Sequence, residues 1–290
     1  MKLFRFGETG QELPGVMLND IKFDVSAFGE DYDEAFFNSD GITRLNEWVK
    51  SNQNECRIVE ENIRMGPPVL KPSKIVCVGL NYAGHAEESG MEIPSEPILF
   101  FKSTTAIVGP DDDLIIPKGS KKTDWEVELG IVISKSAGYV PLEDAMDYIA
   151  GYVLHNDYSE RAFQLEHAGQ WVKGKSADTF APIGPFLVTT DEISDPGNLD
   201  LWLTVNGEEM QRSNTSDMVF DVPHLVSYIS QFMTLLPCDI ISTGTPFGVG
   251  LGLDPPRFLK HGDVVELGIE GLGISRQHVK SYVSTLKNEN

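Results

Sequence analysis

Short apolar runs with the spacing of β-strands dominate the central and C-terminal parts of the chain. Runs of about four to eight apolar residues, bounded by polar or turn residues, are typical of buried strands. L-W-L-T-V-N-G-E (201–208) ends in an Asn-Gly turn, and we expect the return strand to begin at M-V-F-D-V (218–222). Further strands are predicted at residues 74–80, 97–102, 113–117, 151–157, 239–245 and 263–270.

Helical spacing occurs in three segments. An apolar stripe at residues 42–49 follows Ser39 or Asp40, and either residue can cap a helix. Residues 141–150 begin with a proline, which suits the first turn of a second helix. Residues 222–232 predict a third helix with one apolar face. Together with the strands, these segments predict the α+β fold class.

The N-terminal part of the chain differs from the rest. Residues 1–68 combine the first helix with short strands. The segment G-P-P-V-L-K-P-S (66–73) then places three prolines in eight residues, which breaks the regular pattern. We therefore predict a small α+β domain at residues 1–68 and a larger domain at 69–290. The N-terminal strands are predicted at residues 2–6, 15–25 and 57–65.

Three carboxylates stand out in the strand-rich region. Glu126 and Glu128 lie two apart in D-W-E-V-E-L-G-I-V-I, so both side chains of a strand there share one face. Such like charges repel by about a few tenths of a kcal/mol or more, which favours a positive group between them. Asp157 ends a nearby predicted strand. The oxygen trio suits Mg²⁺ or Mn²⁺, although the two glutamates alone fit a solvated strand face equally well.

A histidine and a carboxylate follow the predicted strand at 74–80. In N-Y-A-G-H-A-E-E, His85 and Glu88 are three apart and share a face if the segment forms a helical turn. A carboxylate bonded to one ring nitrogen orients an imidazole and raises its basicity, as a general base for water requires. Taken alone, the segment fits an exposed polar turn better.

Polar and charged residues also follow Asp157. Arg161 and Gln164 share a face with Asp157 if the segment is helical. The arginine could then hold a substrate carboxylate, and an ordinary ion pair at a helix start is the alternative. Lys173 and Lys175 alternate along a segment that we expect to be extended, which by itself favours a solvated surface.

A glycine-rich loop occupies T-G-T-P-F-G-V-G-L-G (243–252). It lacks the Gly-Lys-Ser/Thr ending of a phosphate-binding loop, which argues against a nucleotide site. Its backbone N–H groups or the Thr245 hydroxyl could instead approach another ligand.

Charge and composition exclude several classes of partner. The formal net charge of −21 argues against nucleic acid and anionic membranes, because both need basic patches. No apolar run approaches the ~20 residues of a membrane span, and the start of the chain lacks a signal-peptide pattern. Cys56, Cys77 and Cys238 fit neither a disulfide framework nor a zinc site. We therefore expect a reduced, cytoplasmic protein.

Taken together, these segments resemble the fumarylacetoacetate hydrolase family over about residues 70–285. The likeness rests on five motifs in the family's order. They are N-Y-x-x-H-A-x-E, W-E-x-E-L, N-D-x-S-x-R-x-x-Q, K-S-x-D-T-x-x-P-x-G-P and S-T-G-T-P-x-G-V-G. The resemblance implies a mixed-β roll with a variable N-terminal domain, usually as a homodimer.

The resemblance also implies roles for the candidate residues. It places a metal site on Glu126, Glu128 and Asp157, in agreement with the spacing argument. It makes His85 and Glu88 the pair that activates water.

Other positions follow from the same motifs. Lys175, rather than Lys173, falls on the family's active-site lysine. Leu80 stands where many members carry Arg, and Glu160 stands where a small residue is common, so the substrate could differ. The positions that line the family's substrate pocket correspond to Arg161, Gln164, Gly244 and Thr245.

The implied reaction is Mg²⁺-dependent (or Mn²⁺-dependent) hydrolysis of a carbon–carbon bond in a 2,4-diketo acid, an acylpyruvate. The products are pyruvate and a carboxylic acid. The similarity is greatest to the branch that acts on 2,4-diketo-3-deoxy acids such as L-fuconate or rhamnonate derivatives. Alternatives are a decarboxylase of oxaloacetate or a related 2-oxo acid, a ureidoglycolate lyase, and an inactive metal-binding relative. The presence of both His85 and Glu88 favours hydrolysis of a small anionic 2-oxo acid.

Overall fold

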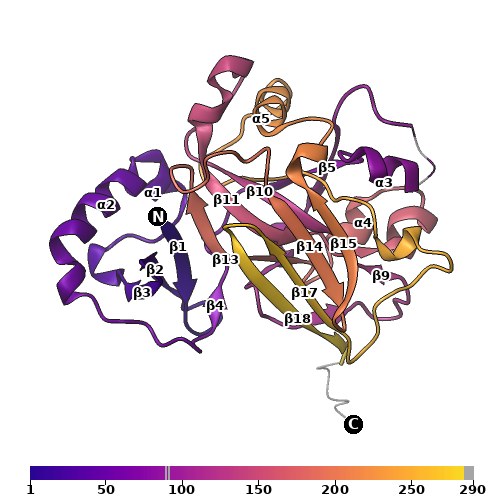
Figure 1. Cartoon of the computed structure of the whole chain (residues 1–290), viewed down its shortest axis with the longest axis horizontal. Helices are drawn as coiled ribbons and strands as arrows, with labels where there is room; N and C mark the ends of the chain where they lie inside the picture. Colours follow the sequence, from indigo (N-terminus) through magenta and orange to yellow (C-terminus); the bar gives the residue numbers. More distant parts are fainter. Residues whose placement is uncertain (89, 91, 284–290) are drawn as a thin grey trace, which may run out of the picture.

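A computed structural model describes residues 1–88, 90 and 92–283 (Figure 1). Its main feature is an eleven-stranded mixed sheet that runs through the whole molecule. In spatial order its strands are β3 (Ile21–Asp24), β2 (Leu13–Leu18), β1 (Lys2–Phe6), β13 (Ala181–Thr189), β11 (Ile149–Asn156), β10 (Val127–Ile133), β16 (Ile240–Ser242), β5 (Ile75–Gly79) and β6 (Ile98–Lys102), with β4 (Met65–Gly66) on β1 and β7 (Ile107–Val108) on β13.

A second sheet packs across β10, β11 and β13 of the first. Its five strands, in order, are β15 (Glu208–Asn214), β14 (Asp200–Val205), β17 (Val264–Ile269), β18 (Gly273–Ser281) and β8 (Leu114–Ile116). A short ladder joins β12 (Ser159–Glu160) to β9 (Thr123–Asp124). The mixed, sheet-dominated α+β architecture confirms the predicted fold class.

Helices lie around the sheets. The α-helices are α1 (Glu34–Asn38), α2 (Gly41–Asn52), α3 (Ala83–Glu88), α4 (Val172–Lys175) and α5 (Val222–Ser230). Shorter helical turns are η1 (Ser26–Phe28), η2 (Gln53–Glu55), η3 (Thr104–Ala106), η4 (Leu142–Tyr148), η6 (Thr215–Asp217) and η7 (Gly250–Gly252), and η5 (Ala162–Glu166) is a π-helix. The helices predicted near 42–49 and 222–232 are confirmed as α2 and α5, whereas the one at 141–150 is the 3₁₀ helix η4.

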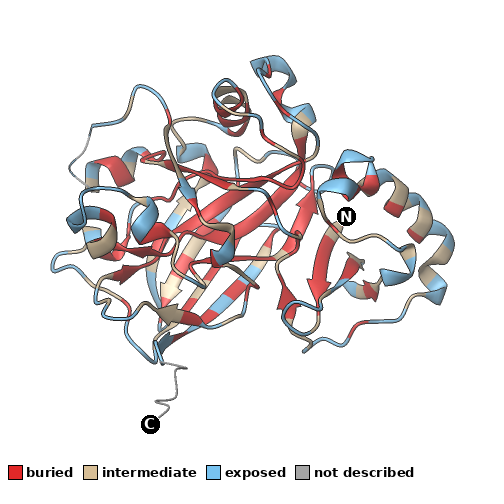
Figure 2. Ribbon diagram, turned by 180° about the vertical axis from the view of Figure 1, so that it is seen from behind, coloured by how far each residue is buried: buried red, intermediate tan, exposed pale blue. Residues whose placement is uncertain are grey.

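The core lies between the two sheets. Every residue of β10 and β11 is buried, and Figure 2 shows these central strands buried along their length. Strands covered on both faces have near-continuous apolar sequences, which explains the run at residues 129–133. A charged residue inside such a strand, as Glu128 is, therefore needs compensating partners.

Two strand predictions in the N-terminal part were wrong. Residues 15–25 form the hairpin β2–β3 instead of one strand, because Asn19 and Asp20 adopt φ values of 49° and 62°. Asn and Asp tolerate this left-handed conformation, which two-residue hairpin turns require. Residues 57–65 contribute an isolated bridge at Ile58 and the start of β4, because a turn at residues 61–62 interrupts the segment.

The return strand after 201–208 was also misplaced. Asn206 and Gly207 form a two-residue turn, so β15 begins at Glu208, opposite Val205. Strand β15 has the polar sequence E-E-M-Q-R-S-N and lies at the edge of its sheet. Edge strands can be polar on both faces, and the search for an apolar run therefore missed it.

The N-terminal residues continue the main sheet. Strand β1 pairs with β2 on one side and β13 on the other. The domain boundary near residues 66–73 stays a prediction, but the hydrogen bonding of the sheet crosses it.

Candidate active site

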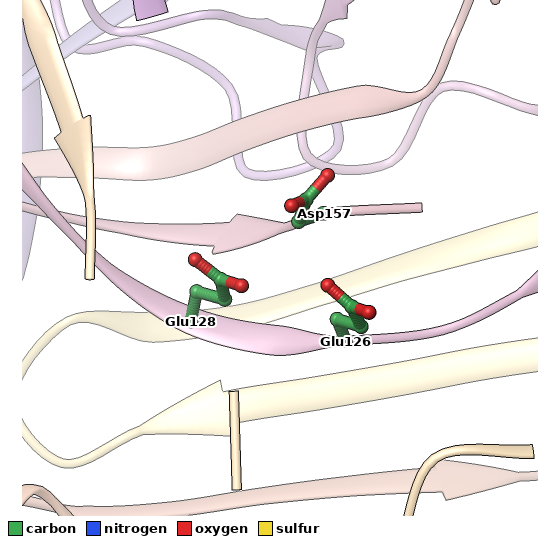
Figure 3. A group of neighbouring side chains, drawn as sticks. All are labelled: Glu126, Glu128 and Asp157. Carbon is green, nitrogen blue, oxygen red and sulfur yellow. The ribbon is translucent and has the colours of Figure 1, made fainter. Parts of the chain in front are cut away.

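The three candidate metal ligands lie together at the ends of two neighbouring strands (Figure 3). Glu128 belongs to β10, Glu126 immediately precedes it, and Asp157 follows β11. The register pairs Val127 with Asn156, and the Asp157 amide donates to the Glu126 carbonyl at 2.9 Å. All three are buried, and each offers a carboxylate oxygen within 4.8 Å of the other two.

Glu128 is held by the strand and loop beside it. Its Oε2 accepts hydrogen bonds from the Ser242 hydroxyl and from the Gly244 amide, the latter at 2.9 Å. Burial raises the pKa of Glu128 well above its usual range, and the negative charges of Asp157 and Glu126 raise it further. Gly244, which the resemblance places at the substrate pocket, thus contacts a candidate metal ligand through its amide.

Buried cations compensate the other two carboxylates. Lys175 Nζ lies 2.6 Å from Glu126 Oε2 and 2.8 Å from Asp157 Oδ2. Lys102 Nζ lies 2.5 Å from Asp157 Oδ1. Burial by itself would raise the pKa of Asp157, but the two ammonium groups hold it well below its usual range. The same carboxylates keep the pKa of Lys175 above its usual range, although burial opposes this.

Arg161 reaches the cluster from a different backbone than predicted. Residues 157–164 are not one helix, because β12 comes first and the π-helix η5 then begins after Arg161. The guanidinium therefore pairs with Asp124, at 2.7 Å from Nε, and with Glu126, at 2.7 Å from Nη2, rather than with Asp157. The contact to Glu126 is an ion pair without hydrogen-bond geometry.

The side-chain amide of Gln164 lies beside Arg161. Its Oε1 accepts a hydrogen bond from Arg161 Nη1 at 3.0 Å. Within the described part of the chain its Nε2 donates to no protein group, so this N–H is available to a ligand.

The predicted histidine–glutamate pair lies on α3. His85 Nδ1 is 3.4 Å from Glu88 Oε2, and Glu88 Oε1 accepts from the Gly248 amide at 3.0 Å. Glu88 thus ties the imidazole to the glycine-rich loop, and Nδ1 is the nitrogen it engages. The opposite nitrogen, Nε2, has no hydrogen-bond partner among the described residues and could face a ligand or water.

The two lysines of the 170–175 segment point to different environments. The expectation of an extended segment was wrong, because residues 172–175 form the one-turn helix α4. Lys173 is exposed, whereas Lys175 is 2% exposed. The helical turn separates side chains that an extended chain would place on one face.

One cavity of about 270 Å³ collects most of these groups. Thr245 lines it, with its Oγ1 fixed by the Val127 carbonyl and the Gln211 amide. Gly244 and Asp157 do not line it but contact residues that do. The other candidates on its surface are His85, Glu88, Glu126, Glu128, Arg161, Gln164 and Lys175.

Two buried residues of this region were missed or left without a role. Asp124 accepts hydrogen bonds from the amides of Gly250 and Leu251, at 2.6 and 3.0 Å, in addition to its pair with Arg161. Lys102 ends the apolar strand β6. An acid beside W-E-V-E-L and a lysine inside an apolar run are signals that could have identified both, since buried charges need partners.

Comparison with known proteins places the chain in a family. Residues 74–280 match the family described as Fumarylacetoacetate (FAA) hydrolase C-terminal. This chain belongs to the fumarylacetoacetate hydrolase family. A curated protein of Burkholderia ambifaria, which carries only the provisional name of a hydrolase, is 50% identical over 283 residues, or 97% of this chain and 99% of that protein.

Solved structures agree with this assignment. The fumarylacetoacetate hydrolase of psychrophilic Exiguobacterium antarcticum is 33% identical, with a TM-score of 0.85 over 97% of this chain and 100% of its own. The maleylpyruvate hydrolase of Sphingobium sp. SYK-6, solved with manganese(II) and pyruvate, is 29% identical, with a TM-score of 0.81 over 98% and 100% of the two chains. Isomerases also occur among the matching structures.

The resemblance and the expectation of an enzyme are therefore confirmed for this fumarylacetoacetate hydrolase family member. Among the described residues, no helix combines the length and the apolar character that crossing a bilayer requires.

Proposed function

We propose that this enzyme hydrolyses the C3–C4 bond of a 2,4-diketo acid, an acylpyruvate, with the help of Mg²⁺ or Mn²⁺. One observation carries the proposal: carboxylates suited to a metal and a base suited to water line a single cavity. Glu126 and Glu128, two carboxylates of the buried trio that suits a hard cation, line the same cavity as the carboxylate-oriented histidine that could activate water.

The trio fits a divalent cation. Its donors are all carboxylate oxygens, as Mg²⁺ and Mn²⁺ prefer, and they lie within 4.8 Å of one another. Glu128 has hydrogen bonds but no cationic partner among the described residues, so a bound divalent cation would provide the counter-charge that its ionised form lacks. Glu126, Glu128 and Asp157 would hold the metal. When bound, it would act as a Lewis acid and template for the carboxylate and 2-oxo oxygens of a 2-oxo acid.

The protein's own residues supply the proton transfers. His85 Nε2 accepts a proton from water, while Glu88 holds the imidazole through Nδ1. The hydroxide adds to the C4 carbonyl, and Gln164 Nε2 or the Lys175 ammonium stabilises the oxyanion, a donor typically worth about 3–4 kcal/mol. The C3–C4 bond then breaks, its electron pair forms the enolate of pyruvate, and a proton returns to C3. The products are pyruvate and the carboxylic acid.

A related enzyme supports the chemistry. The maleylpyruvate hydrolase of Sphingobium sp. SYK-6 was solved with manganese(II) and pyruvate, the metal type and the product proposed here. The 2,4-diketo-3-deoxy sugar acids, the homodimeric state and the cytoplasmic location stay predictions.

Other reactions need fewer of these parts. Decarboxylation of oxaloacetate requires chelation of the 2-oxo acid but no attacking water, and an isomerase moves a proton without breaking a carbon–carbon bond. A lyase acting on a ureido acid and an inactive metal-binding relative are the remaining alternatives. The His85–Glu88 pair favours hydrolysis because it provides a base for water.

The experiment measures pyruvate release after chelation and after return of Mg²⁺ or Mn²⁺, with 2,4-dioxopentanoate and oxaloacetate as substrates. Activity on the diketo acid should require metal, and His85→Ala should lower kcat by at least about 10²-fold. Glu126→Gln should weaken metal binding in titration calorimetry.

Exposed residues provide matched controls. His278→Ala on β18 and Glu47→Gln on α2 should leave both measurements unchanged. Metal-independent cleavage, or full activity of His85→Ala, would refute the proposed mechanism. Faster release from oxaloacetate than from the diketo acid would identify a decarboxylase.

A further inference from the structure

Apolar side chains form much of the cavity surface beyond the carboxylates. Six of them make up what we call the apolar wall, and they come from five separate segments of the chain. A surface assembled in this way is a property of the tertiary fold rather than of one exposed strand. The six residues are Val78, Leu80, Phe100, Leu165, Trp171 and Leu251.

The aromatic part of the apolar wall is held firmly and adjoins the charged cluster. The rings of Phe100 and Trp171 pack edge to face, with centroids 5.3 Å apart. A Cβ on Gly79 would lie 2.7 Å from the Trp171 ring, so the indole packs directly on the backbone of β5. Lys175 Nζ lies 5.1 Å from the centroid of Phe100. The apolar wall therefore adjoins the Lys175 ammonium, which contacts Glu126.

Leu80 contributes to the apolar wall at a conformational cost. Its φ is 56°, in the left-handed region that glycine and asparagine adopt more easily. It is nevertheless a leucine, 6% exposed, at the cavity surface. Unfavourable backbone conformations of this kind often occur at ligand sites.

The positive charges of the cavity are already paired. Among the described residues that line the cavity, the lysine and arginine side chains are those of Lys175 and Arg161. Arg161 contacts Asp124 and Glu126, and Lys175 contacts Glu126 and Asp157. A second carboxylate on the substrate would lie against apolar carbon and near these acids, without a cation of its own, which is costly.

We infer that the acyl group of the substrate is apolar and carries neither a second carboxylate nor a row of hydroxyls. This inference rests on the proposed function and names the substrate class within it: acylpyruvates with an alkyl or aromatic acyl group, in place of the 2,4-diketo-3-deoxy sugar acids that the sequence predicts. A polyhydroxylated acyl group would need hydrogen-bond partners on the apolar wall. Among the six described side chains of the apolar wall, the indole N–H of Trp171 is the one group that can form a hydrogen bond.

Matched substrates test this inference. With metal present, kcat/KM is measured for 2,4-dioxopentanoate, 2,4-dioxooctanoate, 2,4-dioxooctanedioate and a 2,4-diketo-3-deoxy sugar acid. The octanoate and the octanedioate have equal chain lengths and differ only in the terminal methyl or carboxylate. We expect kcat/KM to rise about fourfold for each methylene that reaches the apolar wall, and the octanoate to exceed the octanedioate by at least about tenfold.

Variants of the apolar wall add a second test. Leu165 is 50% exposed at the cavity edge, so Leu165→Arg can fold while placing a cation there. We expect it to raise the kcat/KM ratio of octanedioate to octanoate by about tenfold. Leu165→Met changes the side chain without adding charge and should leave this ratio unchanged. Leu80→Arg should act like Leu165→Arg if its circular dichroism is native.

The outcomes separate the two proposals. If the octanedioate or the sugar acid is cleaved as well as the octanoate, the inference about the acyl group is wrong and the hydrolase survives. An unchanged ratio in a folded Leu165→Arg enzyme overturns it as well. If no acylpyruvate releases pyruvate with either metal, the proposed function itself fails.

Discussion

At the residue scale, the site is a cluster of buried charges that compensate one another. Burying an unpaired charge costs several kcal/mol, so each ion depends on its neighbours. Among the described residues Glu128 has no salt bridge, and a divalent cation would supply the counter-charge that its ionised form needs. Its carboxylates are Asp124, Glu126, Glu128 and Asp157, and its cations are Lys102, Lys175 and Arg161.

The Lys102–Asp157 pair provides a test of this dependence. Both side chains are fully buried, and removing one partner of such a pair typically costs about 3–5 kcal/mol. We expect Lys102→Met to lower the free energy of unfolding by that amount, measured by urea denaturation without divalent metal. Lys118→Met, at an exposed loop position, should change it by less than about 0.5 kcal/mol. A loss below about 1 kcal/mol for Lys102→Met would contradict the argument.

At the scale of elements, strand spacing predicted the central strands β5, β10, β11 and β16 and the shared face of Glu126 and Glu128. Both follow from local spacing, because a two-residue period fixes which side chains share a face. The position of Asp157 followed as well, since β10 and β11 are close in sequence and pair directly.

The remaining parts of the site depend on contacts that have no local signature. Asp124 and Arg161 are far apart in sequence and meet because β9 pairs with β12. The turn of α4, which buries Lys175 and exposes Lys173, depends on packing against η5 and β6. Neither arrangement produces a period in the sequence, and the predictions of a continuous helix and of an extended segment therefore failed.

Asp124 connects three elements around the cavity, and its substitution tests that role. It joins β9 to Arg161 and to the amides of Gly250 and Leu251 at η7. In Asp124→Asn the amide keeps the size but loses the charge and one acceptor. We expect kcat/KM for 2,4-dioxopentanoate to fall by at least about tenfold through a higher KM. The free energy of unfolding should fall by about 1–3 kcal/mol.

The measurement distinguishes positioning from stability. Kinetics are recorded at a temperature at which the variant is fully folded by circular dichroism. Asp147→Asn, at an exposed position of η4, serves as the matched control. An unchanged KM together with reduced stability would mean that Asp124 supports the fold without positioning Arg161.

At the scale of the whole molecule, the N-terminal residues are part of the sheet that carries the site. Strand β1 lies between β2 and β13, and β13 pairs in turn with β11, the strand that Asp157 follows (Figure 1). Phe4 packs edge to face on Phe186 of β13, with centroids 6.2 Å apart. Arg64 pairs with Asp112 at 2.6 Å. These contacts cross the boundary that the proline-rich segment predicts.

Expression of residues 69–290 alone tests whether the larger domain is independent. The fragment lacks Leu3, Phe4 and Phe6, which are 0%, 0% and 4% exposed in the whole chain. Each such side chain contributes about 1.5–3 kcal/mol by burial, and a typical domain is stable by about 5–15 kcal/mol. Loss of β1 also leaves an edge of β13 without its partner. We therefore expect the fragment to aggregate or to melt at a much lower temperature than the whole chain in calorimetry.

Co-expression with residues 1–68 should restore the melting temperature and metal binding, because the missing strand can add to β13 from a separate chain. A soluble fragment that melts like the whole chain would instead establish residues 69–290 as a domain that folds by itself.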